Sequence, residues 1–265
     1  GTIIYITYKM EDQTSSKGKI NLIPDITAFR DIDDFLGKYS NKSADKNNNS
    51  KVHTNTRIGN KSKGIPGASY NIPDAVYPLF LELYYRDIVS KNKKEYLTEK
   101  QRTDDGPLVI DLDFRYDYSV DEKLHTDENL TDLIEIYLQE IKSIYQLDDQ
   151  QEITVYVMEK PSVNRIEKDK LTKDGIHLLF DIQCEREVQM MIREGVLNKI
   201  GDVLKDLPLT NSWDNVLDAG ISKGTTNWQL FGSRKPGYDK YTLTRIFNYV
   251  YDSTDGEFQY NEIPL

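Results

Sequence analysis

Two aspartates on a predicted strand are the clearest candidates for metal chemistry in this sequence. Residues 107–114, PLVIDLDF, alternate between the two faces of a strand, with an apolar row that starts at Leu108. Asp111 and Asp113 then project together from the opposite face. Paired carboxylates hold hard divalent cations such as Mg²⁺ or Mn²⁺ and leave coordination sites for phosphate oxygens. A DxD motif alone is a weak signal, because it also occurs in glycosyltransferases and at solvated strand ends.

A histidine on a second predicted strand adds a group that can contact phosphate. Residues 174–182, DGIHLLFDI, again alternate, and His177 lies off the apolar row. A lone strand histidine is more often structural, but beside carboxylates it can donate to a triphosphate oxygen. Gly175 allows close backbone approach and Lys173 adds a positive point charge, which supports the phosphate interpretation.

A basic turn later in the chain is a further candidate for anion binding. The core of residues 227–245 is GSRKPG, which predicts a turn that presents Ser233, Arg234 and Lys235 together. Arginine can fork onto phosphate oxygens, and lysine adds charge. The alternative is a solvated basic turn without a ligand.

The order of predicted elements brings the two strand motifs together. Helical spacing covers residues 129–147 and 185–206, a strand pattern covers 152–159, and residues 213–221 are predicted as a fourth strand. The order β-α-β-β-α-β defines an α/β (α+β) fold of the ferredoxin-like kind, also found in RNA-recognition modules.

This topology has a geometric consequence for the polar residues. The first strand is central, the third and fourth flank it, and both helices cover one face. Asp111, Asp113 and His177 therefore project from the opposite face, where Asp218 of the fourth strand can join them. Three carboxylates can hold two ions, which would activate a 3′-hydroxyl and steady a leaving pyrophosphate.

The first part of the chain predicts a smaller unit with a basic loop. Residues 37–64 carry six Lys and one Arg against one Asp, a net charge of +6, and an Asn/Ser tract. Residues 40–51 are best explained as a solvated insert. The later part of this loop could lie beside a template, through Arg57, Lys61 and Lys63, and a helix is predicted from Pro73 to Leu97.

Bulk properties exclude several protein classes. The net charge of −10 argues against a generic nucleic-acid coat, but a template-dependent enzyme can concentrate positive charge locally. The single Cys184 excludes a disulfide framework or a cysteine-rich zinc site and favours a reduced, intracellular setting. The sequence contains no apolar run of ~18 residues, so no membrane span is predicted. The start at Gly1 suggests that more protein lies beyond one or both ends.

Three motifs in order resemble the archaeo-eukaryotic primase superfamily, most closely the primase part of primase-helicase proteins of large DNA viruses such as poxviruses and giant viruses. They are VIDLDFRY (109–116), KDGIHLLF (173–180) and LDAGISKGTTNWQLFGSRKPG (217–237), within a match of roughly residues 54–244. Together they are far more specific than any one alone. The HTNTRIGNKSKGIPGASYNIPD stretch is similar to the region that precedes the catalytic strands in these viral proteins.

The resemblance implies a role for each motif. Asp111 and Asp113 would be metal ligands, Asp218 a third acidic ligand, and His177 a contact to the incoming nucleotide. The GSRK segment would bind triphosphate through Arg234 and Lys235. Many relatives carry Ser where this chain has Gly175, so a hydroxyl contact to phosphate is missing there. The zinc module of many cellular primases is also absent from this sequence.

The resemblance also implies the architecture and the partners. A small unit (1–105, with the basic Asn/Lys-rich loop at about 37–64) would pack on an RRM-like catalytic unit (106–265), with the active site in the cleft. The partners would be single-stranded DNA template, nucleoside triphosphates and a helicase domain in the full-length protein, with no membrane. A viral protein of this kind would act in the host cytoplasm or viral factory.

The sequence therefore predicts a DNA primase or primase-polymerase that uses two Mg²⁺ or Mn²⁺ ions. A metal-dependent nuclease or phosphodiesterase would use a similar acidic cluster but has less need of a triphosphate-binding Arg/Lys pair. A non-catalytic single-strand-binding module would carry stacking aromatics on the open face, where Asp111 and Asp113 are predicted instead. A glycosyltransferase would explain the DLD motif but not the later motifs.

Overall fold

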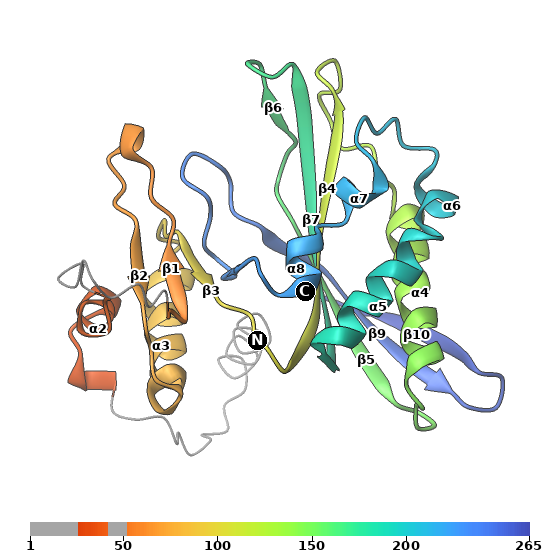
Figure 1. The fold of residues 1–265 in the computed structure, drawn as a ribbon, viewed down its shortest axis with the longest axis horizontal. Coiled ribbons are helices and arrows are strands. Elements are labelled where there is room, and N and C mark those ends of the chain that lie inside the picture. Colours follow the sequence, from red (N-terminus) through yellow and green to blue (C-terminus); the bar gives the residue numbers. More distant parts are fainter. Residues whose placement is uncertain (1–25, 42–51) are drawn as a thin grey trace. The chain divides into compact units, whose positions relative to one another are not determined.

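The chain folds into two compact units. The computed structural model describes residues 26–41 and 52–265. Unit 1 comprises Gly1–Lys100 and Asn227–Lys240, and unit 2 comprises Gln101–Thr226 and Tyr241–Leu265 (Figure 1). The chain thus passes between the units three times, and the smaller unit includes a segment from late in the sequence. Most of the predicted solvated insert, residues 42–51, lies outside the described residues.

Unit 1 contains a small antiparallel sheet and short helices. The strand order is β2-β1-β3-β8, and the element bounds are β1 Asn55–Arg57, β2 Ala68–Tyr70, β3 Leu97–Glu99, β8 Trp228–Gln229, α2 Ile32–Lys38 and α3 Tyr77–Tyr84, with 3₁₀ turns η1 Ile26–Ala28 and η2 Lys61–Lys63. The core combines aliphatic and aromatic residues, and Phe35 stacks on Phe80 at 6.0 Å between ring centroids. Leu230, from the late segment, belongs to the same core.

The predicted helix over residues 73–97 is correct at its start and wrong at its end. It begins as the 3₁₀ turn η3 (Asp74–Val76), continues as α3, and ends as the π-helical turn η4 (Tyr85–Val89). Residues 90–96 are polar, and Asn92 has a left-handed φ of 50°. Such a conformation does not continue a helix, so the chain turns and enters strand β3.

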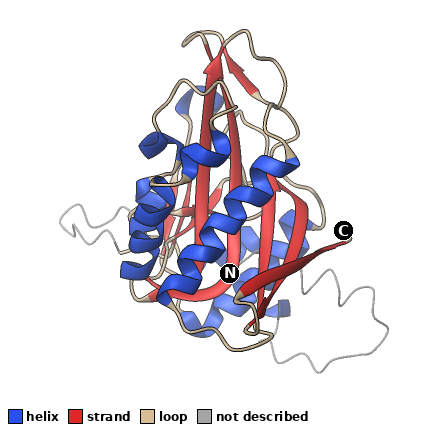
Figure 2. Cartoon of the chain, turned by 90° about the vertical axis from the view of Figure 1, so that its right-hand side faces the viewer, coloured by secondary structure: helices blue, strands red, loops and turns tan. Residues whose placement is uncertain are grey.

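Unit 2 is a larger antiparallel sheet covered by helices on one face. The strand order is β10-β9-β5-β7-β4, and β6 pairs with β7. The bounds are β4 Asp105–Asp117, β5 Glu152–Glu159, β6 Asn164–Ile166, β7 Leu171–Glu185, β9 Thr242–Asp252, β10 Glu257–Ile263, α4 Asp127–Ile144, α5 Arg186–Leu197, α6 Ile200–Leu204, α7 Trp213–Val216 and α8 Ala219–Lys223. Helices lie against one face of the sheet (Figure 2), and residues of α4 and α5 share one buried core with the strands. The α+β class predicted from the sequence is confirmed.

The apolar rows predicted on β4 and β7 form the main core. Leu108, Leu112 and Phe180 are at most 2% exposed and belong to one cluster with Leu133 of α4 and Val196 of α5. The predicted helix over 185–206 is interrupted at Asn198 and Lys199 and becomes α5 and α6. Ile200 and Leu204 stay buried in the same core, so the apolar period continues across the break.

The fourth strand predicted over residues 213–221 is wrong. This segment forms α7 and α8, and Leu217, which lies between them, makes an isolated β-bridge to Leu112 of β4. The apolar residues there are spaced three and four apart, which is helical spacing. The segment still runs along the outer edge of β4, where the fourth strand was expected, since the Asp218 N–H donates to the Asp111 carbonyl at 3.1 Å.

Strands β9 and β10 form a hairpin that extends the sheet beyond β5. Asp252 and Glu257 pair at its closed end, and Gly256 has a φ of +70°. The Asp-Gly pair in this turn is a recognised hairpin signal. Among the described residues, no helix combines the length and the apolar character that crossing a membrane requires.

Candidate functional site

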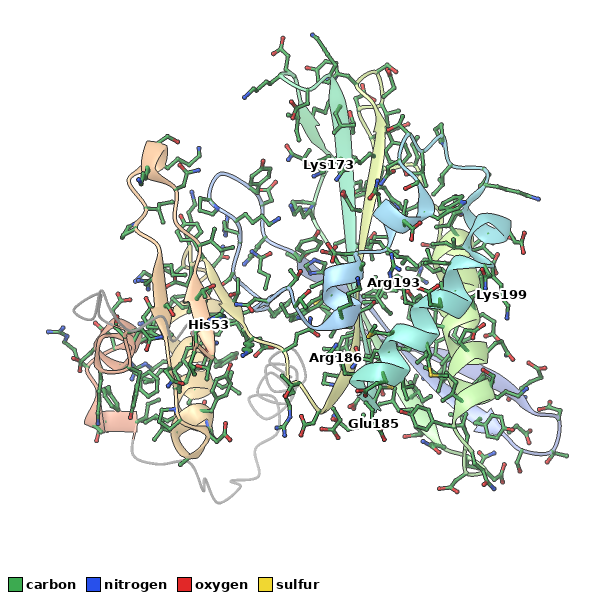
Figure 3. All side chains as sticks on the ribbon, viewed as in Figure 1. His53, Lys173, Glu185, Arg186, Arg193 and Lys199 are labelled. Carbon is green, nitrogen blue, oxygen red and sulfur yellow. The ribbon has the colours of Figure 1, made fainter. Side chains whose placement is uncertain are left out.

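Three cross-strand pairs bring the predicted residues of β4 and β7 onto one face of unit 2. Asp111 lies opposite His177, Asp113 opposite Gly175, and Arg115 opposite Lys173. Directly paired residues of neighbouring strands project from the same face. The helices cover the other face, so the predicted convergence of Asp111, Asp113 and His177 is confirmed. Lys173 extends the row along β7 (Figure 3).

The carboxylate of Asp111 lies close to the imidazole of His177. Their Oδ1 and Nε2 atoms are 3.5 Å apart, and the side chains are 29% and 9% exposed. Met158 of β5 lies opposite His177 on its other side and is buried. The imidazole is therefore almost fully buried on this face, and its Nε2 atom faces the carboxylate.

The carboxylate of Asp113 attracts two cationic side chains. The Nε and Nη2 atoms of Arg115 lie 3.0 and 2.9 Å from its Oδ2, and Nζ of Lys173 lies 3.9 Å from the same oxygen. Arg115 therefore pairs with the neighbouring acid on its own strand. The Asp113 side chain is 27% exposed, so the pairs contribute little stability. They do show that positive charge collects at this point.

Asp218 is anchored beside Asp111 through its backbone. In addition to the hydrogen bond to the Asp111 carbonyl, its Oδ1 accepts the Ile221 N–H at 2.9 Å and so caps the N-terminus of α8. The cap fixes the orientation of the carboxylate. The third predicted carboxylate therefore reaches the edge of β4 from a loop and not from a strand.

Two arginines of α5 hold the segment that carries Asp218. Arg193 donates through Nη2 to the Leu217 carbonyl at 2.8 Å, and Arg186 donates through Nη1 to the Ser222 carbonyl at 3.1 Å. Both side chains extend from α5 toward this segment (Figure 3). Gly224, with φ +74°, ends α8, and a Cβ there would lie 2.7 Å from the Arg186 guanidinium.

An asparagine on the same segment clamps the backbone of β4 between Asp113 and Arg115. Nδ2 of Asn211 donates to the Asp113 carbonyl at 2.8 Å, and its Oδ1 accepts the Arg115 N–H at 3.2 Å. The amide side chain thus replaces a strand partner at this edge. This positioning role was not predicted from the sequence.

Tyr241 covers His177 on the open face. The two rings stack with centroids 3.6 Å apart and an interplanar angle of 15°. Burial, with the charges of Asp111, Asp113 and Asp174, raises the pKa of the Tyr241 hydroxyl, which therefore keeps its proton and remains a donor. No sequence signal distinguishes this tyrosine among 18 in the chain.

Behind the site, a buried ionic cluster connects three parts of unit 2. Nε2 of His125 lies 2.7 Å from Glu159, its Nδ1 lies 3.4 Å from Asp174, and Nζ of Lys123 lies 2.7 Å from Asp174. Burial alone would lower the pKa of His125, but the contacts with Asp174 and Glu159 outweigh burial and raise the pKa to about 9. The cluster was not predicted from the sequence. The signal that could have indicated it is Asp174, a carboxylate at a position that continues the apolar row of β7.

In unit 1, the basic turn brings together residues from two distant segments. The side chain of Lys63 packs over Gly237, whose added Cβ would lie 2.7 Å from Lys63 Cε. Burial lowers the pKa of Lys240, and the positive charge of Arg234 lowers it further. The effect of this charge indicates that the two cations lie near each other. Nε of Arg234 is buried and has no hydrogen-bond partner among the described residues. Lys235 is exposed, so this basic turn can accept an anion.

Other candidates of unit 1 are engaged within the unit. Ser233 is 1% exposed, and its hydroxyl accepts the Leu97 N–H at 3.1 Å and pairs with the Tyr84 hydroxyl at 2.9 Å. Arg57 makes two hydrogen bonds to the Glu95 carboxylate at 2.9 and 3.0 Å. Lys61 is exposed in the turn that precedes Lys63. The contacts of Ser233 and Arg57 favour structural roles for both.

The candidate metal ligands are carboxylates, which Mg²⁺ and Mn²⁺ prefer. Asp111 and Asp113 offer them on the open face, and Asp218 offers one from the segment along the edge of β4. In the described ranges 26–41 and 52–265, no three His, Cys, Asp or Glu side chains already form a metal-binding group. Since Arg115 occupies the Asp113 carboxylate, metal binding there requires Arg115 to exchange its contact.

Comparisons with known proteins identify the class to which this fold and site belong. The family model described as "C962R protein N-terminal AEP domain" matches residues 59–247, which include all three motifs. The chain therefore belongs to the archaeo-eukaryotic primase family. It is similar to the "Putative helicase L207/L206" of Acanthamoeba polyphaga mimivirus, with 30% identity over 195 residues, which cover 71% of this chain. The match spans 20% of that relative's length.

Proposed function

We propose that this chain is a DNA primase or primase-polymerase that joins nucleoside triphosphates on a single-stranded DNA template. The observation that carries the proposal is the pairing of Asp111 with His177 and of Asp113 with Gly175 on one face, with Asp218 tied to the Asp111 carbonyl. Membership of the primase family supports the same reaction. The name of the mimivirus relative supports a helicase domain elsewhere in the full-length protein.

The reaction is an in-line displacement at phosphorus. A 3′-hydroxyl oxygen bonds to the α-phosphorus, the bond to the oxygen bridging to the β-phosphate breaks, pyrophosphate leaves, and the hydroxyl proton passes to water. Two divalent ions, held by Asp111, Asp113 and Asp218, would lower the hydroxyl pKa and neutralise charge on the leaving group. His177 and Lys173 would donate to triphosphate oxygens from the β7 side of the row.

The charges already present on the open face support this assignment. Arg115 and Lys173 approach Asp113, so the site balances carboxylates with cations that a triphosphate can recruit. When the negatively charged nucleotide enters, these cations gain phosphate partners and release the carboxylate. In unit 1, Arg234, whose Nε is buried without a hydrogen-bond partner among the described residues, and exposed Lys235 form a separate basic turn that can bind phosphate.

The deciding experiment is primer synthesis on single-stranded DNA with labelled nucleotides and Mg²⁺ or Mn²⁺. We expect the wild type to make oligonucleotides and the Asp111→Asn/Asp113→Asn variant to make none while it unfolds at a similar temperature. Asp121→Asn/Asp132→Asn is the matched control, since both residues are exposed and lie outside strands β4 and β7. It should retain activity.

The rival functions predict different outcomes in the same assay. Cutting of the template without nucleotide would establish the nuclease. DNA binding without any product, equal in the wild type and the Asp111→Asn/Asp113→Asn variant, would establish the non-catalytic binding module.

A further inference from the structure

Tyr241 reaches across the sheet of unit 2 to the residues of the candidate site. It directly precedes β9, while Leu243 pairs with Met158 of β5 and Met158 pairs with His177 of β7. The tyrosine side chain therefore crosses β5 to stack on the imidazole. Nζ of Lys160 lies 5.1 Å from the centroid of the tyrosine ring, which adds a cation–π contact.

The hydroxyl of Tyr241 occupies the space that a side chain at position 175 would need. A Cβ built on Gly175 would lie 2.3 Å from the Tyr241 oxygen and 3.3 Å from Cζ. Gly175 is not among the glycines with a positive φ, so its backbone conformation does not require glycine. The requirement is steric, and it comes chiefly from the hydroxyl oxygen of Tyr241, the residue just before β9.

That oxygen lies in the middle of the polar row. Gly175 is opposite Asp113, between the pair that contains His177 and the pair that contains Lys173. The tyrosine oxygen therefore approaches the row between its carboxylates and its phosphate-binding cations. A hydroxyl donor at this point can bind a phosphate oxygen without adding charge.

We propose that Tyr241 positions the nucleotide: its ring fixes the His177 imidazole, and its hydroxyl donates a hydrogen bond to the triphosphate at the place left open by Gly175. The proposal rests on the proposed function, because it takes a nucleoside triphosphate as the ligand. It adds a hydroxyl donor that comes from outside the three motifs. Glycine at 175 and tyrosine at 241 are then a matched pair.

Moving the hydroxyl from one strand to the other tests the proposal. The variants are Tyr241→Phe, Gly175→Ser, Gly175→Ser/Tyr241→Phe and Gly175→Ala/Tyr241→Phe, with Tyr260→Phe on β10 as the exposed control. The measurements are the thermal unfolding temperature, the Kd for a non-hydrolysable nucleoside triphosphate, and KM and kcat in the primer assay.

We expect Tyr241→Phe to keep the ring stack and the unfolding temperature but to weaken nucleotide binding by roughly ten- to a hundredfold, the usual effect of losing one hydrogen bond to a charged group. KM should rise while kcat changes little. Gly175→Ser alone should unfold at a lower temperature because of the clash. The Ser/Phe double variant should recover both stability and binding, whereas the Ala/Phe double variant should recover stability only.

Two results would overturn the role of the hydroxyl. One is wild-type nucleotide affinity in Tyr241→Phe, and the other is equal affinity in the two double variants. A failure of the proposed function would give a different result from either of these two. The folded wild type would then bind no nucleotide, but Tyr241→Phe would still restore the stability that Gly175→Ser loses. Equal behaviour of Tyr260→Phe and wild type is the expected control.

Discussion

The Nη2 atom of Arg193 donates a hydrogen bond to the carbonyl oxygen of Leu217, 2.8 Å away. Arg193 belongs to the helical layer and is 8% exposed, whereas Leu217 directly precedes Asp218. A helix on the covered face thus holds the backbone that presents a carboxylate at the edge of the sheet. Arg193 is therefore a positioning residue, although it lies far from the motifs in the sequence.

Replacing Arg193 by methionine should reduce both stability and activity. The change leaves the Leu217 and Asp214 carbonyls without this donor, and a hydrogen bond to a charged group contributes about 1.5–3 kcal/mol. Denaturant unfolding and primer synthesis measure the two effects. The exposed Lys205→Met serves as the control, and an unchanged free energy of unfolding in Arg193→Met would contradict the assignment.

Asp218 has two roles that different substitutions separate. Asparagine is as good an N-cap as aspartate, whereas alanine loses about 1 kcal/mol at such a position. Asp218→Asn should therefore unfold like the wild type but bind Mn²⁺ more weakly, and Asp218→Ala should lose both stability and metal affinity. Calorimetric Mn²⁺ titration and thermal unfolding check this. Full Mn²⁺ affinity in Asp218→Asn would remove Asp218 from the metal site.

His125 should make the stability of unit 2 depend on alkaline pH. Its pKa of about 9 in the folded state lies above the ordinary 6.5, so its contribution is complete below pH 6.5 and is lost as the pH rises through 9. At about 1.4 kcal/mol per pKa unit, the loss is on the order of 3 kcal/mol. Chemical unfolding at pH 6, 7, 8 and 9 measures it.

The control for this pH dependence is a second histidine. His125→Gln should flatten the decline between pH 6.5 and 9, whereas His53→Gln in unit 1 should keep it. A decline of equal size in His125→Gln would assign the pH dependence to other groups.

Ser233→Ala tests whether this residue binds nucleotide or stabilises unit 1. Its hydroxyl accepts the Leu97 N–H, and leaving a buried donor unsatisfied costs about 1–3 kcal/mol. We expect a lower free energy of unfolding with an unchanged nucleotide Kd. Arg234→Met should show the reverse pattern. Weakened nucleotide binding in a stable Ser233→Ala protein would instead support a nucleotide contact.

Strict alternation allowed the core of the site to be predicted from the sequence. The rows on β4 and β7 fixed which face each residue takes, and the register then placed Asp111 opposite His177. The strand predicted over residues 213–221 was wrong. The apolar residues there follow helical spacing, and the segment forms helices; these residues are Trp213, Val216, Leu217 and Ile221. The backbone of Asp218 nevertheless lies beside Asp111, since the segment follows the edge of β4 where the strand was expected.

Contacts that depend on tertiary packing could not be predicted in this way. Tyr241 meets Gly175 because β9 and β5 place a side chain across two strands, and no spacing in the sequence encodes that distance. Asn211 and Arg193 likewise act on backbone groups, which any amide or guanidinium could satisfy. Their roles follow from the fold and not from residue type.

The late segment of unit 1 determines the order in which the protein can be completed during synthesis. Strand β8, Leu230 and Ser233 complete a sheet and core whose other parts lie before residue 101. A ribosome must therefore add about 140 further residues, including most of unit 2, before unit 1 can close. The nascent smaller unit exposes its aromatic core during that interval, so a chaperone that binds apolar segments would find its target there.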